Sequence, residues 1–140
     1  MELEAKELFR LKVFIAPPIE VGRVNGGVLQ VIPIIGGTFQ GQDIAGKVLP
    51  GGADWNTTFD DGTSHVEARY VLETNDGEYI VVENEGFIAM DSASRIKTSP
   101  SFIADQNGKY HSLNHGSYVG ELEASSADEN SVDITFYRMV

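Results

Sequence analysis

Apolar and polar residues alternate along much of this chain, and the alternation predicts β-strands. In residues 7–16, Phe9, Leu11 and Val13 fall on one face, and basic side chains stand between them. Because successive side chains of a strand point to opposite sides, this pattern is typical of a strand with one buried face. Comparable patterns predict further strands over residues 28–35, 38–49, 55–59, 65–74, 78–90, 110–123 and 131–139.

Glycine-containing turns separate these segments. The clearest is Asn75-Asp76-Gly77, which favours a tight hairpin because Asn, Asp and Gly tolerate the backbone angles of such a turn. Gly36-Gly37 and Pro50-Gly51-Gly52 predict sharp bends, as where a sheet curls on itself. About eight to ten short strands, with little helix, indicate an all-β fold: an antiparallel barrel in one domain over residues 1–140.

Two segments depart from the alternation. Residues 28–35 are apolar on both faces, which is typical of a strand covered on both sides. The barrel interior supplies one cover, and a second subunit, a helix or a long loop supplies the other, so a homo-oligomer is one expectation. Residues 91–101 are polar and contain Pro100, and they predict a loop or a single helical turn that could cover one end of the barrel.

The charge balance excludes several kinds of partner. With 21 acidic and 10 basic residues, the formal net charge is −11, which repels nucleic-acid phosphates and anionic membranes. The chain has no cysteine, so disulfides and thiolate chemistry are excluded. Residues 1–8 lack the features of a signal peptide, and no apolar run approaches the ~20 residues of a membrane helix. We therefore expect a cytoplasmic protein that binds neither nucleic acid nor membrane.

Sequence signatures for cofactors and metals are also missing. The phosphate-binding loop, the dinucleotide glycine fingerprint and the serine-hydrolase elbow are absent, so we expect no cofactor. The histidines are His65, His111 and His115. The last two are four residues apart, a separation of ~13 Å on a strand and too long for one metal ion. We therefore expect no metal site.

The glycine-rich motifs carry a family resemblance. Residues 33–41 (PIIGGTFQG), 49–55 (LPGGADW) and 67–77 (EARYVLETNDG) resemble the uncharacterised protein family 0311, also called domain-of-unknown-function family 3237. Shorter matches extend the likeness over nearly the whole chain. The resemblance implies an antiparallel β-barrel of the calycin or lipocalin kind, and it implies no particular activity. Two positions depart from the family pattern: Ser112 replaces a frequent aromatic residue, and Phe87-Ile88 follow Gly86 where relatives often carry an arginine.

Glu67 and Arg69 are candidates for chemistry because they are charged, and they lie two residues apart on one face of a predicted strand. Inside the barrel they would form a buried ion pair that could polarise a ligand, whereas in solvent they would be an ordinary surface pair. The opposite face carries Ala68, Tyr70 and Leu72, which is more typical of a core. The surface interpretation is therefore favoured.

Asp54 and Trp55 follow the glycine corner and have two interpretations each. Asp54 could act as a general base or orient a ligand, and Trp55 could form the wall of a pocket. Alternatively, Asp54 caps the turn and Trp55 plugs one barrel end. Asn84 and Asn114 offer amides that could fix a ligand, although turn or bulge roles explain them equally well.

Three functions are compatible with the sequence. The first is binding of a small apolar or aromatic molecule inside the barrel, since a barrel of eight strands is just wide enough for one. The second is a cofactor-independent isomerase, lyase or cyclase, with Asp54 or Glu67 as the base and Arg69 stabilising an oxyanion. The third is a structural module with a filled barrel that assembles through residues 28–35. The candidate ligand-binding residues are Trp55, Tyr70, Asn84, Phe102, Asn114 and Tyr118.

Overall fold

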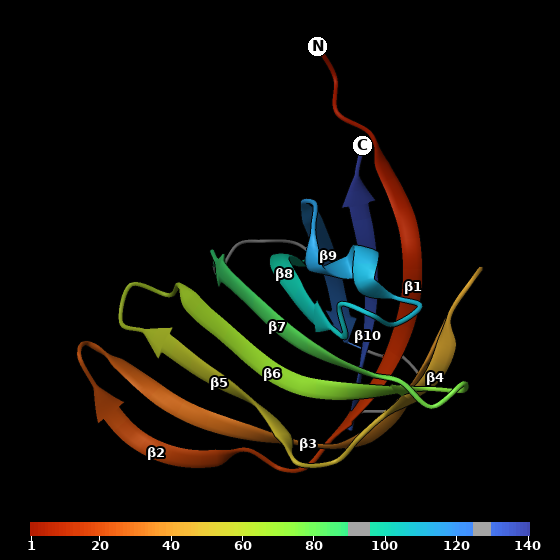
Figure 1. Ribbon diagram of the computed structural model, residues 1–140. Helices are drawn as coiled ribbons and strands as arrows, with labels where there is room; N and C mark the ends of the chain where they lie inside the picture. Colours follow the sequence, from red (N-terminus) through yellow and green to blue (C-terminus); the bar gives the residue numbers. More distant parts are fainter. Residues whose placement is uncertain (90–95, 125–129) are drawn as a thin grey trace.

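The computed structural model describes residues 1–89, 96–124 and 130–140, and antiparallel strands make up most of it (Figure 1). The strands are β1 (Ala5–Ile15), β2 (Ile19–Val24), β3 (Gly27–Gly41), β4 (Ala45–Val48), β5 (Gly52–Phe59), β6 (Ser64–Thr74), β7 (Tyr79–Ile88), β8 (Ile96–Ala104), β9 (Tyr118–Ala124) and β10 (Ser131–Met139). A short 3-10 helix, η1 (His111–Asn114), lies between β8 and β9. In the part of the chain that the structure describes, no helix is long and apolar enough to cross a membrane.

The strands close into a barrel, which confirms the predicted fold class. The barrel order is β1, β10, β9, β8, β7, β6, β4 and β3, and it closes because β1 pairs with both β10 and β3. The two chain ends lie together, since Ala5 on β1 is opposite Met139 on β10. Closure satisfies the backbone hydrogen bonds that an open sheet would leave at its edges.

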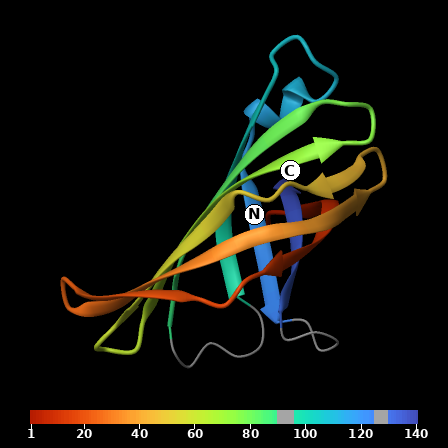
Figure 2. The same ribbon diagram turned by 90° about the horizontal axis from the view of Figure 1, so that it is seen from below.

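A second, curved sheet projects from one side of the barrel. Here β3 and β6 separate, and β5 lies between them and pairs with both, while β2 pairs with β3. In Figures 1 and 2 these strands run out from the barrel, away from β9 and β10. We call this part the projecting sheet. Because β3 and β6 are continuous, each contributes to the projecting sheet with its first half and to the barrel with its second half.

The predicted bend at Gly36-Gly37 lies where β3 passes from the projecting sheet into the barrel. There β1 and β3 approach closely: a Cβ atom at Gly37 would overlap the carbonyl oxygen of Lys12. Its φ of +146° is also one that other residues rarely adopt. Glycine is therefore required at this position for the sheet to close.

Aromatic rings fill the middle of the barrel. The ring of Phe9 lies 5.4 Å from Phe39, 5.9 Å from Phe102 and 5.5 Å from Phe136, measured between centroids. Tyr118 packs edge-on against Phe102 at 5.0 Å. Such tilted contacts are the arrangement that aromatic pairs prefer. The middle of the core is therefore packed with side chains.

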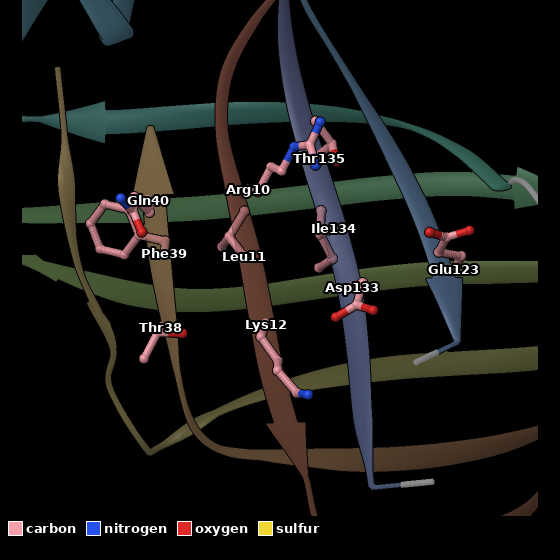
Figure 3. Close-up of a pocket in the computed structure, with 10 residues that line it drawn as sticks. All are labelled: Arg10, Leu11, Lys12, Thr38, Phe39, Gln40, Glu123, Asp133, Ile134 and Thr135. Carbon is pink, nitrogen blue, oxygen red and sulfur yellow. The ribbon is translucent and has the colours of Figure 1, made fainter. Parts of the chain in front are cut away.

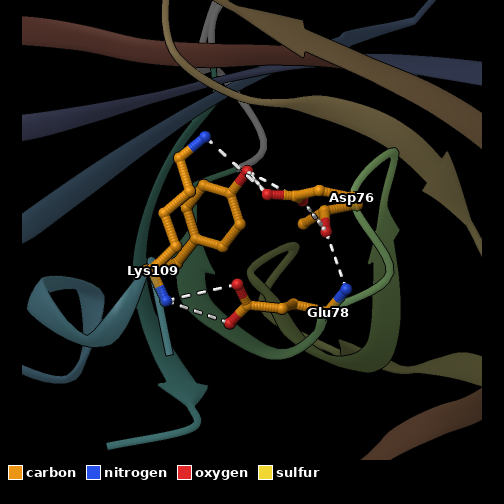
Figure 4. Close-up of polar contacts among 5 residues, drawn as sticks. Asp76, Glu78 and Lys109 are labelled. Atoms are coloured by element: carbon orange, nitrogen blue, oxygen red, sulfur yellow. Dashed lines mark hydrogen bonds and ion pairs between the residues drawn. The ribbon is translucent and has the colours of Figure 1, made fainter. Parts of the chain in front are cut away.

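One end of the barrel is tied down by polar contacts between the β6–β7 turn and the segment before η1 (Figure 4). The carboxylate of Asp76 accepts hydrogen bonds from the hydroxyls of Thr74 (2.5 Å) and Tyr110 (3.0 Å and 3.1 Å). The backbone N–H of Lys109 lies 3.2 Å from both carboxylate oxygens of Glu78. The predicted turn at residues 75–77 is thus confirmed, and its acidic residues serve as anchors.

Four segments differ from the sequence-based expectation. The single strand expected over residues 38–49 is the end of β3 followed by the separate strand β4. Residues 96–101 belong to β8 and not to a loop; the expectation was wrong because the inward positions of β8 include Thr98 and Pro100, which hide the alternation. The remainder of the expected cover, residues 91–95, lies outside the described residues. The strand expected over residues 110–123 begins only at Tyr118. Strand β2 was not predicted, because most of its residues are exposed and show no alternation.

Candidate functional site

The register of four strands brings a set of inward side chains together where the barrel meets the projecting sheet. Ile32 on β3 lies opposite Asp54 on β5, Asp54 lies opposite Ala68 on β6, and Ala68 lies opposite Asn84 on β7. Residues directly opposite each other in antiparallel strands share a face. Tyr70, two residues beyond Ala68, shares that face as well. Sequence-distant residues thus form one inner row.

These side chains border a pocket of about 70 Å³, which we call the interior pocket. Nine of its lining residues are aliphatic, and they come from β1, β3, β6, β9 and β10. Its polar members are Asp54, Tyr70 and Asn84. An apolar cavity with a few convergent polar groups is the usual composition of a site for a small molecule.

Two polar atoms at the interior pocket have no hydrogen-bond partner among the described residues. They are the hydroxyl of Tyr70 and the side-chain carbonyl oxygen of Asn84, and both residues are only 2% exposed. The hydroxyl of Thr98 on β8 is a third such atom, and Thr98 does not line the pocket. Leaving a buried polar group unpaired costs about 1–3 kcal/mol. The hydrogen-bonding capacity of these atoms is not used by other described residues.

Asp54 adds a titratable group to the interior pocket. Burial raises the pKa of its carboxyl group above the usual range, against the opposing effect of a hydrogen bond from the backbone N–H of Glu67 at 3.1 Å. Burial also raises the pKa of the Tyr70 phenol, and the nearby charge of Asp54 raises it further. Tyr70 therefore remains a hydroxyl donor at neutral pH. Together the site offers a proton-exchanging acid, a phenol donor and an amide acceptor.

Of the candidates from the sequence, Asp54, Tyr70 and Asn84 come together at the interior pocket. Phe102 and Tyr118 belong instead to the aromatic core, and they do not line this pocket.

The candidate Asn114 is exposed. Its amide nitrogen donates to the carbonyl of Ala104 and its amide oxygen accepts from the Ala104 N–H, both at 2.8 Å. These bonds tie the η1 segment to β8, so the structure gives Asn114 a structural contact and no pocket to line.

Trp55, Glu67 and Arg69 point away from the interior. For Glu67 and Arg69 this is the surface interpretation that the sequence favoured, whereas Trp55 neither forms the wall of the interior pocket nor plugs a barrel end. Trp55 lies directly opposite Glu67 on the outer face, and its side chain is 44% exposed. Arg69 pairs with Glu83 across β6 and β7 at 3.5 Å, and not with Glu67. The cause is strand alternation: Ala68 and Tyr70 occupy the inner face, so the residues between them face solvent. This removes Glu67 and Arg69 from any interior chemistry.

The sequence analysis did not identify most of the aliphatic residues that line the interior pocket, nor the small residue that leaves room for it. Ala68 is the small residue of the inner row, flanked by Asp54 and Asn84 on the neighbouring strands. A single small residue on an otherwise bulky apolar face is the signal that could have indicated a cavity there.

Another depression lies on the outside of the barrel, across β3, β1, β10 and β9, with a volume of about 360 Å³ (Figure 3). Its charged residues, such as Arg10, Lys12 and Asp133, lie on the outer face, where Lys12 is opposite Asp133. Within the described ranges, it holds no buried polar atom that lacks a partner. It therefore offers less specific recognition than the interior pocket.

Comparison with known proteins places this architecture in a family. The model for proteins of unknown function designated DUF3237 matches residues 3–139. A protein named UPF0311 from Rhodopseudomonas palustris strain TIE-1 is 40% identical over 84 residues, which are 60% of this chain and 55% of the relative; the chain thus spans about half the length of the curated relatives it matches.

Solved structures agree with this assignment. A β-barrel-like protein from Acinetobacter baumannii AYE superposes with a TM-score of 0.87 at 26% identity, over 100% of this chain and 98% of that one. A protein described as an enzyme from Penicillium herquei shares the fold, with a TM-score of 0.79 at 20% identity over 100% and 96% of the two chains. Since the family model covers nearly every residue, the chain belongs to the DUF3237 family of proteins of unknown function, also named UPF0311.

Proposed function

We propose that this protein binds a small, largely apolar molecule through the interior pocket, and that Tyr70 and Asn84 hydrogen-bond to the polar group of that molecule. The observation that carries the proposal is the pair of buried, unpartnered polar atoms on these two residues, at the edge of an apolar cavity. Donor and acceptor together suit a hydroxyl group, which accepts a hydrogen bond from Tyr70 and donates one to the carbonyl oxygen of Asn84. Unpaired buried polar groups lower the free energy of unfolding of the ligand-free protein, and a ligand that pairs with them raises it.

The size of the interior pocket limits what it can hold. Its volume of about 70 Å³ is roughly half that of the ~150 Å³ cavity known to accept benzene in another protein. The pocket therefore suits a compact group of a few heavy atoms, either a very small molecule or the polar end of a longer one.

The test uses 2-butanol as the probe, and its binding is followed by backbone amide NMR shifts. We expect saturable shifts at Ala68 and Asn84 in the wild type. Tyr70→Phe removes the donor and keeps the ring, so the dissociation constant should rise about five- to ten-fold, equivalent to about 1–1.4 kcal/mol. Ala68→Leu fills the cavity and should abolish the shifts.

The matched control is Tyr79→Phe, which removes the hydroxyl of an exposed tyrosine that donates to Glu73 at 2.9 Å. This variant should bind 2-butanol as the wild type does. Equal binding by all four proteins, or unchanged binding by Ala68→Leu, would show that the probe does not use the interior pocket.

A second function, acid–base catalysis without a cofactor, is favoured by one observation: burial raises the pKa of Asp54 beside the same pocket. An acid that exchanges its proton nearer neutral pH is suited to general acid–base catalysis of an isomerisation, elimination or cyclisation. In this proposal Asp54 moves the proton and Tyr70 hydrogen-bonds to the developing oxyanion. Neither role involves Glu67 or Arg69.

The two functions are separated by the fate of a bound molecule. A natural ligand that is recovered unchanged after incubation with the wild type supports binding alone. A ligand that the wild type converts, and that Asp54→Asn binds but leaves intact, supports catalysis.

A cytoplasmic location is part of the same proposal, and the cysteine-free sequence is compatible with a reducing compartment. Fractionation of the cells that produce the protein tests it.

A further inference from the structure

Three metal-ligating side chains meet on the outer face of β6 and β7. His65 and Glu67 are two residues apart on β6, and Glu85 on β7 lies directly opposite Glu67. One ligand atom from each of the three lies within 4.8 Å of those from the other two. We propose that this trio binds a divalent cation of the zinc class, at a site separate from the interior pocket.

The imidazole of His65 is already oriented toward the two carboxylates. It stacks on the ring of Phe87, its opposite residue on β7, with the centroids 4.4 Å apart and the planes 19° apart. Its Nε2 atom lies 2.9 Å from a carboxylate oxygen of Glu85, and the side chain is only 21% exposed. A ligand held in place before binding loses less conformational freedom when the cation arrives.

The negative charges of Glu67 and Glu85 favour binding of a cation. Glu67 and Glu85 are directly opposite each other, and like charges in that position destabilise a strand pair. The nearby Arg69 is engaged with Glu83. Within the described part of the chain, no lysine or arginine forms an ion pair with Glu67 or Glu85. A bound dication would relieve this repulsion in a chain whose net charge is −11.

The donor set indicates which cation. Zn²⁺ binds imidazole nitrogen and carboxylate oxygen at metal–ligand distances of ~2.0–2.2 Å. The three donor atoms lie within 4.8 Å of one another, and small side-chain rotations would bring them to these distances from a shared ion. Mg²⁺ and Ca²⁺ prefer oxygen ligands alone. Three protein ligands leave at least one position for water.

The sequence-based expectation of no metal site considered the spacing of histidines along the chain. The third ligand of this trio comes from the neighbouring strand, 20 residues away. Only the β6–β7 register brings Glu85 to His65, so the spacing along the chain could not reveal it.

The test is equilibrium dialysis of the full chain, without an affinity tag and after chelator treatment, against Zn²⁺ and separately against Mg²⁺. We expect one Zn²⁺ per chain and a clear preference for Zn²⁺ over Mg²⁺. His65→Ala and Glu67→Gln should each weaken Zn²⁺ binding by about ten-fold or more, the scale seen when the surroundings of a metal site are disturbed.

Two variants serve as matched controls. His111→Ala removes an exposed histidine outside the trio, and Glu73→Gln removes a carboxylate farther along β6 that pairs with Lys47. Both should bind Zn²⁺ like the wild type, and circular dichroism checks that every variant is folded. Absence of Zn²⁺ binding by the wild type, equal affinity for Mg²⁺, or equal effects of His65→Ala and His111→Ala would each overturn the proposal.

Discussion

Asp54 and Glu67 are carboxylates on adjacent strands, yet they occupy opposite environments. Asp54 faces the interior pocket, where burial raises the pKa of its carboxyl group, whereas Glu67 is exposed on the outer face. The backbone N–H of Glu67 donates to Asp54 at 3.1 Å, so the two residues are in contact through the sheet itself. At this scale, side-chain direction decides which carboxylate can carry interior chemistry.

Asp54→Asn should change how stability depends on pH. In the wild type the folded pKa lies above the unfolded value of ~3.9, so the native state binds the proton more tightly and stability falls as pH rises through that window. The amide does not titrate. We therefore expect Asp54→Asn to gain in unfolding free energy relative to the wild type between pH ~4 and neutrality.

Urea unfolding at several pH values measures this difference. Asp43→Asn, which alters an exposed aspartate by the same change in charge, is the control and should not show the same trend. A difference between Asp54→Asn and the wild type that stays constant with pH would contradict the prediction.

The sequence was enough to identify the polar residues of the interior pocket as candidates, but not to show that they lie together in space. Asp54, Tyr70 and Asn84 are polar or aromatic residues in strand-like segments, and that made them candidates. Whether they share a face depends on how β5, β6 and β7 are aligned, and a shift by one residue reverses every side chain. Trp55 was misplaced for this reason: it is next to Asp54 in the chain and on the other side of the sheet.

At the scale of elements, the β6–β7 turn is held to the segment before η1 by Asp76. Its carboxylate receives hydroxyl hydrogen bonds from Thr74 and Tyr110, and Lys109 Nζ lies 3.7 Å away. The hydrogen bond from Thr74 is the main cause that lowers the pKa of Asp76, with Tyr110 adding to it. The anchor therefore works best when Asp76 is ionised.

Asp76→Ala should loosen this end of the barrel. We expect a lower Tm at neutral pH and faster hydrogen exchange at the backbone amide of Lys109, while amides of β1 keep their protection. Because the folded pKa of Asp76 is depressed, its contribution is present above the unfolded value of ~3.9 and is lost as pH falls through the folded value. The difference in Tm should thus shrink in acid.

Asp60→Ala provides the comparison, since Asp60 pairs with Arg23 at 2.7 Å on the projecting sheet. It should leave exchange at Lys109 unchanged. If both variants accelerate exchange at Lys109 equally, the anchor at Asp76 is not specific.

Elements with one clearly buried face could be predicted, and those without one could not. In β1 and β10, alternation survives because most of their buried residues are apolar: Phe9, Leu11 and Val13 on β1, and Ile134 and Phe136 on β10. In β2 nearly every residue is exposed, and in β8 the inward residues include Thr98 and Pro100, so neither strand shows the expected pattern.

At the scale of the whole molecule, closure rests on the pairing of β1 with β3, while β3 also supports the projecting sheet. Composition and glycine bends indicated a barrel, but nothing in the linear pattern shows that one strand serves two sheets. The outer face of the projecting sheet leaves large apolar side chains in solvent: Ile19 is 57% exposed, Trp55 is 44% exposed and Phe87 is 73% exposed. Exposed apolar groups of this kind are typical of interaction surfaces.

Self-association through this face is a prediction that light scattering can check. We expect a dimer at high protein concentration that dissociates on dilution. Added salt should strengthen it, because screening reduces the repulsion between two chains of net charge −11. Trp55→Glu should give a monomer, whereas Ile103→Glu, which changes an equally exposed residue on β8, should not. A monomer at every concentration and salt level would remove the case for assembly.

The alternation of inward and outward residues along β6 also limits which insertions and deletions this strand can accept during evolution. The side chain of Tyr70 points into the barrel, whereas those of Glu67 and Arg69 point to solvent, because successive residues of a strand face opposite sides of the sheet. Inserting or deleting one residue before Glu67 would turn both charges into the apolar cavity and expose the phenol. Unless a β-bulge absorbs the extra residue, as bulges do elsewhere in this protein, such a change disrupts the pocket, so we expect natural variants of this strand to differ mainly by substitution.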